Sequence, residues 1–481
     1  MYLFSLLLYV ILVSCTLAER LGLPVNRKIG WKTENKNHGP YRGQPEQVHI
    51  AYSGTCTRQT SPIVITFSGD VTKMSVTWLT YDDTERSFVE YGENGSFNRK
   101  VEAQISSFVD GGKKHTVRYI HRALIENVQP IHRYVYRVGS EYGWSSIYSF
   151  VGLKNRTDDK FTVAVYGDMG NINARSLGKL QQMSQNGEFD MIIHNGDLAY
   201  DLIDHDGDVG DEFMRQIEPM AAYVPYMINV GNHDRYYNYS HMVNRFTMPN
   251  TDHNLFYSFD LGLTHFVAIN TELYYYSEYS MIQNQWNWLV NDLKRANSNR
   301  QVVPWLIVYM HRSFYCSDIE GFCDVHEQII RNGINREGTF GLESLLYKFG
   351  VDLILSAHEH SYERLWPIYQ YQIFNGTSSA YVDPPAPTIL IVGSAGCQEN
   401  TNHYPTNPPD WSAFRSENYG FGRLQIYNRT HLHFEQLMAS ENKVEDDLWL
   451  IKTKHQTRTS EDLKQLKRYG TYVKPSVYSE L

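Results

Sequence analysis

The chain has 481 residues, of which 42% are hydrophobic and 20% are charged, and its formal net charge at pH 7 is −9. This is the composition of a globular protein, and the length is enough for two or three domains. The net negative charge and the lack of long basic runs argue against nucleic acid or an anionic membrane surface as the main partner. A small anionic substrate would therefore need a local positive centre.

Residues 1–18, MYLFSLLLYVILVSCTLA, form an apolar stretch that ends in small residues. Thr16 and Ala18 stand where a signal peptidase site would place them, so we predict a secretory signal peptide and an extracellular or lumenal, lysosome-like location. The stretch has no Lys or Arg before its apolar part, which leaves an uncleaved anchor as the alternative, but it is short for a membrane span. We expect no stable membrane anchor.

Export would place four cysteines in an oxidising compartment: Cys56, Cys316, Cys323 and Cys397. Cys316 and Cys323 are close enough in CSDIEGFC to close a small loop, and we predict a disulfide between them; four free thiols are the alternative. Cys56 and Cys397 could pair or stay apart. In a secreted glycoprotein the five N-x-S/T sequons would lie on the surface, at Asn94, Asn155, Asn238, Asn375 and Asn428.

Residues 46–155 show short alternating runs of apolar and polar residues. The run KMSVTWLT directs Met74, Val76 and Trp78 to one face, and HRYVYRVGS alternates in the same way. Turn residues such as GENGS separate these runs. The pattern predicts an antiparallel β-sandwich that resembles a fibronectin type III domain and has no catalytic cluster.

Beyond the polar linker KNRTDDK, residues 160–440 contain five apolar runs that each end in a polar cluster: FTVAVYGDMG, FDMIIHNGDLAY, VPYMINVGNHD, VPWLIVYMHR and VDLILSAHEHSYER. Such runs fit strands that are covered on both faces. The segments ARSLGKLQQMSQ and SMIQNQWNWLVNDLKRA have the apolar spacing of helices with one buried face. We therefore predict an α/β layered domain, in which PTILIVGSAG and GRLQIYNRTHLHFEQL could complete a second sheet. Residues 441–481 would form a packed or trailing C-terminal extension.

The polar clusters at the five strand ends offer ligands for metal ions. They contain Asp168, Asp197, Asn232, His311 and the pair His358/His360. Because the carboxyl ends of strands in an open α/β sheet meet at one edge, these side chains can converge. In an extended chain the two histidines of the pair would lie on the same side, so that two metal ions could each take one.

Carboxylate, amide, phenolate and imidazole donors together suit a hard trivalent ion beside a softer divalent ion. Asp197 has two oxygens and can bridge the two ions. Tyr200 follows it by three residues, and a phenol with a pKa of about 10 binds as phenolate at neutral pH only beside a strongly polarising cation. Tyr200 therefore indicates Fe(III), with Zn, Fe or Mn as the divalent ion. Such a pair can ionise water near neutral pH, clamp both oxygens of an in-line displacement and attract a phosphate monoester.

The ordered set GDMG, GDLAY, GNHD, VYMH and AHEH resembles the signature of purple acid phosphatases, within the calcineurin-like metallophosphoesterases. The segments VDLILSAHEHSYERLWPIYQYQIFNGT and ILIVGSAGC are similar to the long animal form of the family, and the likeness runs from about residue 46 to residue 450. The resemblance implies the role of each ligand. Asp168, Tyr200 and His360 would bind the ferric ion, Asn232, His311 and His358 the divalent ion, and Asp197 would bridge them.

The resemblance also implies that His233 faces the substrate and protonates the leaving alkoxide; the alternative is that it only hydrogen-bonds the bound phosphate. Plant members have Gly where this chain has Ala357, and they carry further histidines shortly after the equivalent of His311, where this chain reads RSFYCSD. The segment LIDHDGDVGDEF offers Asp204, His205, Asp206 and Asp208 as a further metal site, but we predict a solvated loop. His194 is predicted to pack in the core or to support a ligand rather than to bind metal itself.

These features predict a secreted acid phosphatase that hydrolyses small phosphate monoesters by in-line attack of metal-bound hydroxide. A metallophosphodiesterase is one alternative. A secreted binding glycoprotein with a vestigial site is another, but a degenerate site would be expected to have lost at least one ligand. A homodimer is compatible with the sequence.

Overall fold

The computed structural model describes residues 42–54, 69–154, 160–251, 253–276, 278–319, 328–335, 337–375 and 379–473. The predicted signal peptide, Asn155, Cys56 and Cys323 lie outside these residues. Among the residues described, no helix is both long and apolar enough to cross a membrane.

The N-terminal domain is a sandwich of two antiparallel sheets, as the alternating runs predict. One sheet has the order β1 (Glu46–Gly54), β2 (Gly69–Thr80), β6 (Val117–Ile125) and β5 (Gln104–Val109). The other has the order β4 (Arg99–Glu102), β3 (Phe88–Glu93), β7 (Arg133–Ser140) and β8 (Gly143–Trp144), and β9 (Tyr148–Val151) pairs with β7. The alternating residues of β2 and β7 are buried between the sheets: Met74, Val76, Trp78, Tyr134, Tyr136 and Val138.

A six-stranded sheet begins the second domain, with the order β12 (Tyr226–Asn229), β11 (Met191–Asn195), β10 (Phe161–Tyr166), β22 (Gly420–Ile426), β23 (His431–Met438) and β24 (Val444–Ile451). The first three strands are parallel and the last three antiparallel. Strand β24 comes from the predicted C-terminal extension and is paired along its length with β23. All residues of β10, β11 and β12 are buried, which explains their continuous apolar runs.

The second sheet of this domain has seven strands, in the order β13 (Tyr257–Leu261), β14 (Thr264–Ile269), β15 (Trp305–Met310), β16 (Leu353–Ser356), β20 (Thr388–Val392), β17 (Tyr362–Leu365) and β21 (Ser412–Ser416). Strands β14, β15, β16 and β20 are parallel. The run PTILIVGSAG supplies β20 of this sheet, whereas GRLQIYNRTHLHFEQL supplies β22 and β23 of the six-stranded sheet. The two late runs therefore complete two different sheets.

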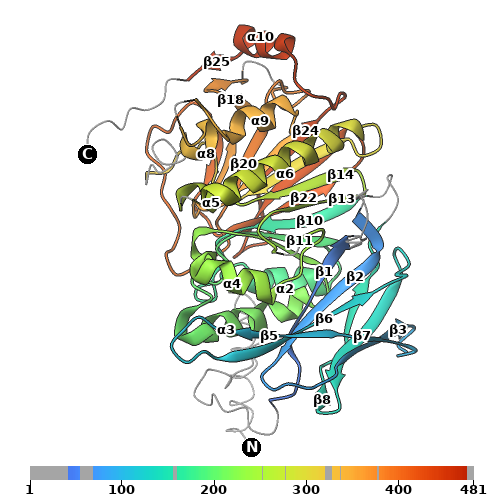
Figure 1. Cartoon of the computed structure of the whole chain (residues 1–481). Coiled ribbons are helices and arrows are strands. Elements are labelled where there is room, and N and C mark those ends of the chain that lie inside the picture. Colours follow the sequence, from blue (N-terminus) through green and yellow to red (C-terminus); the bar gives the residue numbers. More distant parts are fainter. Residues whose placement is uncertain are drawn as a thin grey trace, which may run out of the picture.

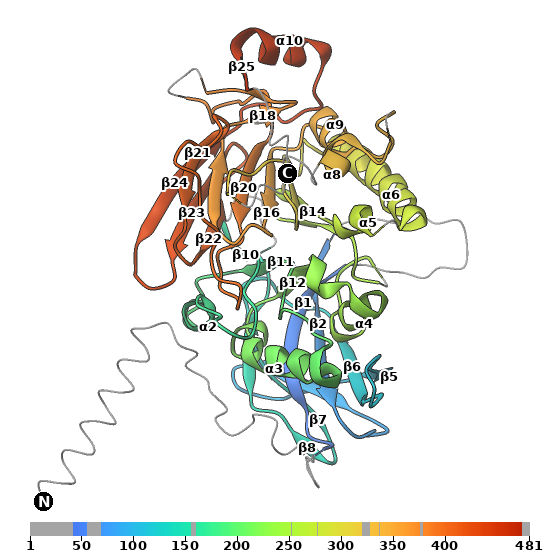
Figure 2. The same ribbon diagram turned by 90° about the vertical axis from the view of Figure 1, so that its left-hand side faces the viewer.

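Helices cover both sheets (Figures 1 and 2). Near the six-stranded sheet lie α2 (Leu177–Gln185), α3 (Asp204–Ala221) and α4 (Tyr236–Arg245), and near the other lie α5 (Glu272–Tyr275), α6 (Tyr279–Ser298), α8 (Gln328–Asn332) and α9 (Leu342–Lys348). The short helix η2 (Asn232–Asp234) stands between β12 and α4 in the chain. At the far end from the sandwich, α10 (Ser460–Tyr469) packs beside a small sheet of β18 (Ile368–Tyr369), β19 (Gln372–Ile373) and β25 (Thr471–Tyr472). The predicted helices correspond to α2 and α6.

The segment LIDHDGDVGDEF is a solvated loop only at its start, where Asp204 and His205 are exposed and the backbone at residues 205–207 is not helical. The rest of the segment belongs to helix α3, which lies against β1 of the sandwich. Asp211 of α3 is buried and accepts hydrogen bonds from Arg118 of the sandwich at 2.7 Å and from Arg245 at 2.7 Å. Asp206 accepts from the backbone N–H of Lys114 at 2.9 Å. Asp206 and Asp211 thus join the two domains, because Lys114 and Arg118 belong to the sandwich.

Two of the cysteines lie in the described part of the second domain. Cys316 is disulfide-bonded, and Cys323, its predicted partner, lies outside the described residues. Cys397 is free and buried, so it does not pair with Cys56. Of the described sequons, Asn94, Asn238 and Asn428 are exposed and Asn375 is partly exposed.

Candidate metal centre

The predicted ligands follow the carboxyl ends of strands from both sheets of the second domain. Asp168 follows β10, Asp197 and Tyr200 follow β11, and Asn232 opens η2 after β12. His311 follows β15, and His358 and His360 follow β16. The Asn195 amide ties the two sheets together here, since its Nδ2 donates to the carbonyls of Met310 at 2.9 Å and Leu355 at 3.2 Å.

Four of these side chains sit on strained backbone. The φ angles are +56° at Asp168, +50° at Asp197, +59° at Tyr200 and +69° at His358, in the left-handed region that residues with a Cβ rarely adopt. Such strain persists only where the surroundings enforce it, and it concentrates at functional sites. The segment of His358 and His360 is therefore a turn and not the extended chain expected from its spacing.

Tyr200, His360 and Asp168 form one half of the cluster. The Tyr200 hydroxyl lies 2.6 Å from Nε2 of His360 and 3.3 Å from Oδ1 of Asp168, and Nε2 of His360 lies 3.7 Å from the same oxygen. All three side chains are buried. These are the three residues that the resemblance assigns to the ferric ion alone.

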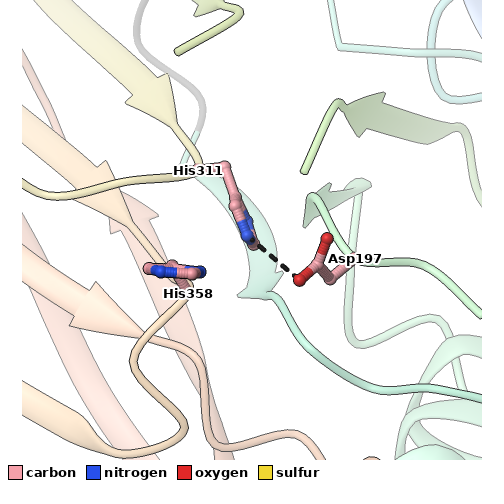
Figure 3. A group of neighbouring side chains, drawn as sticks. All are labelled: Asp197, His311 and His358. Carbon is pink, nitrogen blue, oxygen red and sulfur yellow. Dashed lines mark ion pairs between the residues drawn. The ribbon is translucent and has the colours of Figure 1, made fainter. Parts of the chain in front are cut away.

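Asp197, His311 and His358 form the other half (Figure 3). One donor atom from each lies within 4.8 Å of the others, which is close enough to share a metal ion. Nε2 of His311 lies 3.2 Å from Oδ2 of Asp197. Asn232 is linked to this half by Arg312, whose Nη2 donates to Oδ1 of Asn232 at 3.3 Å and whose Nη1 lies 2.8 Å from Nε2 of His358.

The histidine rings are oriented so that Nε2 faces the cluster. Nδ1 of His311 lies 2.9 Å from the carbonyl of Asn195, and Nδ1 of His360 lies 3.0 Å from the carbonyl of Asn400. Because a carbonyl oxygen can only accept a hydrogen bond, both Nδ1 atoms carry the proton. In the neutral ring Nε2 then has a free lone pair. In the described structure Nε2 of His311 is buried without a hydrogen-bond partner, although it faces a carboxylate. A lone pair aimed at a carboxylate requires a cation between them, so the residues fit a metal ion.

The electrostatics of the cluster also favour cations. Burial opposes protonation of His311, but the charges of Asp197 and Asp168 raise its pKa to about 10, so a proton would occupy the site where no metal ion does. Burial raises the pKa of Tyr200 well above its ordinary value, and the charges of Asp168 and Asp197 raise it further. The phenol therefore ionises only when a strong positive charge lies beside it, as the sequence argument requires.

Asp234, the last residue of GNHD, holds the turn that carries Asp197. Its carboxylate accepts backbone N–H groups from Asp197 at 2.8 Å, Leu198 at 3.2 Å and Gly231 at 2.9 Å. The side chain of Asp197 in turn accepts the backbone N–H of His233 at 2.8 Å. Asp234 and Asn195 are absent from the predicted site, although Asp234 belongs to GNHD and Asn195 directly precedes GDLAY.

His233 lies between two carboxylates that the sequence analysis did not assign. Its Nδ1 is 3.2 Å from Oδ1 of Asp201, and its Nε2 is 3.7 Å from Oε1 of Glu399. Burial lowers the pKa of His233, but the hydrogen bond to Asp201 and the charges of Asp197, Asp201 and Glu399 raise it to about 9. His233 is partly exposed, with 21% of its side chain accessible, so a substrate can reach it. The only feature of the sequence that could have identified Asp201 as a site residue is its position directly after Tyr200 in HNGDLAYD.

His194 and Ala357 stand in the strand-end segments of the sequence but are not among the predicted ligands. His194 is buried, and its Nδ1 lies 2.6 Å from the Tyr226 hydroxyl, so it packs in the core as expected. Ala357 packs closely against Gly167, because a Cβ added to Gly167 would lie only 2.4 Å from the Cβ of Ala357. The small side chain of Ala357 fits beside the glycine.

Three family models match consecutive parts of the chain. Residues 45–151 match the purple acid phosphatase N-terminal domain, residues 161–362 the calcineurin-like phosphoesterases, and residues 386–447 the iron/zinc purple acid phosphatase-like protein C domain. Together with the site, these matches define a metal-dependent phosphoesterase with a preceding β-sandwich.

The chain belongs to the purple acid phosphatase family. It is 44% identical over 428 residues to acid phosphatase type 7 of Danio rerio, covering 86% of this chain and 93% of that protein. It is 42% identical over 415 residues to acid phosphatase type 7 of Mus musculus, covering 85% and 91%. The solved structure of a purple acid phosphatase from yellow lupin seeds has the same fold, with a TM-score of 0.68, 24% identity and coverage of 88% of this chain and 76% of that one.

Membership makes this chain a metal-dependent acid phosphatase that hydrolyses phosphate esters. The family implies a dinuclear metal centre, and Asp197, His311 and His358 form a group that could hold a metal ion at the ends of the strands that carry the motifs. A relative from Arabidopsis thaliana that is 26% identical over 432 residues is named an Fe(3+)-Zn(2+) purple acid phosphatase.

Proposed function

We propose that the chain is a secreted acid phosphatase that hydrolyses phosphate monoesters at a mixed Fe(III)–divalent centre. The observation that carries this proposal is the Tyr200 hydroxyl, which is buried against His360 and Asp168 on one side of Asp197. A phenol in this position suits a ferric ion because no weaker cation would displace its proton. The ferric ligands would be Asp168, Tyr200 and His360, the divalent ligands Asn232, His311 and His358, and Asp197 the bridge.

When bound, the two cations would supply an activated water for attack on phosphorus and positive charge for the transition state. The protein's own residues do the rest. Asn195 and Asn400 fix the ring orientations of His311 and His360 through their carbonyls, and Asp234 fixes the turn of Asp197. This preorganisation spares the site a rearrangement during the reaction.

His233 is proposed to give its proton to the leaving alkoxide. Asp201 accepts a hydrogen bond from Nδ1, which leaves Nε2 to face the substrate. Its raised pKa keeps it protonated in mildly acidic solution, where an acid phosphatase works. Two bound cations would lower this pKa again, towards the range in which a general acid is most effective.

Monoesters are favoured over diesters because Tyr200 is the residue that sets purple acid phosphatases apart from related dinuclear enzymes. The diesterase remains the second candidate. A vestigial site is not favoured, since every ligand position is filled with a residue that can bind metal. Secretion rests on residues 1–18 and on the exposed sequons, and Fe(III) on Tyr200.

The test combines metal analysis with a substrate panel. The protein expressed through a secretory pathway is expected to contain one iron and one divalent ion per chain and to cleave monoesters faster than diesters at acidic pH. A colourless protein with two zinc ions would refute the Fe(III) assignment. Faster cleavage of diesters would establish the second candidate instead.

A further inference from the structure

The side chain of Arg312 lies beside the proposed ligands and, among the described residues, contacts the segments of Glu272, His358 and Asn232. Its Nε donates to both oxygens of Glu272, at 3.0 and 3.1 Å. Its Nη1 lies 2.8 Å from Nε2 of His358, and its Nη2 lies 3.3 Å from Oδ1 of Asn232. One edge of the guanidinium is therefore bound to a carboxylate, and the other edge faces the site.

Arg312 is held firmly in this orientation. Glu272 is fully buried, and Thr271 donates its hydroxyl to the carboxylate at 3.1 Å and accepts the backbone N–H of Arg312 at 3.2 Å. The Tyr275 ring lies 4.2 Å from the guanidinium carbon. Arg312 itself is only 8% exposed. A guanidinium fixed in this way loses little further conformational freedom when it binds a ligand.

The position of this charge is unexpected for a site that binds cations only. Asn232 and His358 are two of the proposed ligands of the divalent ion, and a guanidinium cannot bind a metal ion but repels it. The repulsion is offset if an anion lies between the two positive charges. The phosphate group of the substrate is such an anion, and its oxygens match the two parallel N–H groups of a guanidinium fork.

We propose that Arg312, oriented by Glu272, is a substrate-binding residue that donates Nη1 and Nη2 hydrogen bonds to phosphoryl oxygens of the ester. In the free protein Nη1 faces His358 and Nη2 donates to Asn232. When His358 and Asn232 bind the cation, Nη1 and Nη2 would donate to the phosphate instead. The inference rests on the proposed function. It also supplies a cationic group in RSFYCSD, the segment after His311 that has no histidine.

The experiment measures the binding of inorganic phosphate to the metal-loaded enzyme, by calorimetry and by competitive inhibition. Arg312→Ala is expected to weaken phosphate binding about 10- to 100-fold and to raise KM, with unchanged metal content by elemental analysis. Arg312→Lys is expected to recover part of the loss, because lysine keeps the charge but not the fork. The control is Arg86→Ala, which removes an exposed bidentate pair with Glu102 in the sandwich and should leave phosphate binding unchanged.

Removing Arg312 alone leaves the buried charge of Glu272 without this partner, so the double variant Arg312→Ala/Glu272→Gln is measured beside it. The same loss of phosphate affinity in both supports the proposal. Wild-type phosphate affinity in variants that contain both metals would overturn it, and so would a loss that only follows loss of the divalent ion. Failure of the wild-type enzyme to bind phosphate or cleave monoesters would instead refute the proposed function, whatever the variants do.

Discussion

Replacement of His233 by Asn tests whether this residue is the acid of the reaction. With a pKa of about 9 in the protein without bound cations, the ring at pH 6 would be protonated in roughly a thousandfold excess over the neutral form. A positioned general acid contributes about 10²- to 10⁴-fold to the rate. We therefore expect His233→Asn to lower kcat by about that factor for an alkyl phosphate, whose alkoxide leaves poorly without a proton.

An aryl ester such as p-nitrophenyl phosphate provides the internal comparison. Its leaving phenolate is stable without protonation, so His233→Asn should lower its kcat by only about tenfold or less. The measurement is kcat for both esters between pH 4 and 8, with metal content checked in each preparation. Equal losses for the two esters would refute the role as acid and favour a simple hydrogen bond to bound phosphate.

Asp201→Asn gives an independent check on the same reasoning. The variant removes the charge and weakens the hydrogen bond that raise the pKa of His233, so the pKa should fall. The acid form of His233 is lost as pH rises through its pKa, so the descending limb of the alkyl-ester kcat profile should move to lower pH. An NMR titration of His233 in the metal-free protein measures the pKa directly. An unchanged pKa in Asp201→Asn would contradict the assigned cause.

Three further predictions concern the metal centre and the fold. A phenolate bound to Fe(III) should give a visible charge-transfer band. Tyr200→Phe should abolish this band while the circular dichroism spectrum stays unchanged, and a retained band would mean that another residue binds the iron. Gly196→Ala should displace His311, because the added Cβ would overlap its ring and Gly196 has a φ of +88°; elemental analysis should find less divalent metal, and full occupancy would count against this geometry. Asp211→Ala should lower the free energy of unfolding by about 3–5 kcal/mol in urea titrations, since it removes the buried carboxylate that pairs with both Arg118 and Arg245. Asp82→Ala, which breaks an exposed ion pair, is its control, with a loss below about 1 kcal/mol, and a similar loss in both would refute the argument.

The sequence was sufficient to predict the order of the two domains and the strands that carry the ligands. Period-two alternation marks one-sided burial, which is why β2 and β7 were recognised with the correct inward faces. Continuous apolar runs mark burial on both faces, which identified β10, β11, β12, β15 and β16. Since each of these strands ends in a polar cluster, the proposed ligands could be named from local pattern and resemblance.

Contacts between distant segments were beyond the reach of the sequence. The sequence around Arg312 does not predict its contact with Glu272, and the sequence around His233 does not predict its contact with Glu399. The contact of Asp211 with Arg118 of the sandwich could not be predicted from LIDHDGDVGDEF either. A side chain's charge, ring orientation and pKa depend on which groups the fold brings within a few ångströms. Burial strengthens those interactions by excluding water, so only the tertiary structure decided which polar residues bind, orient or join domains.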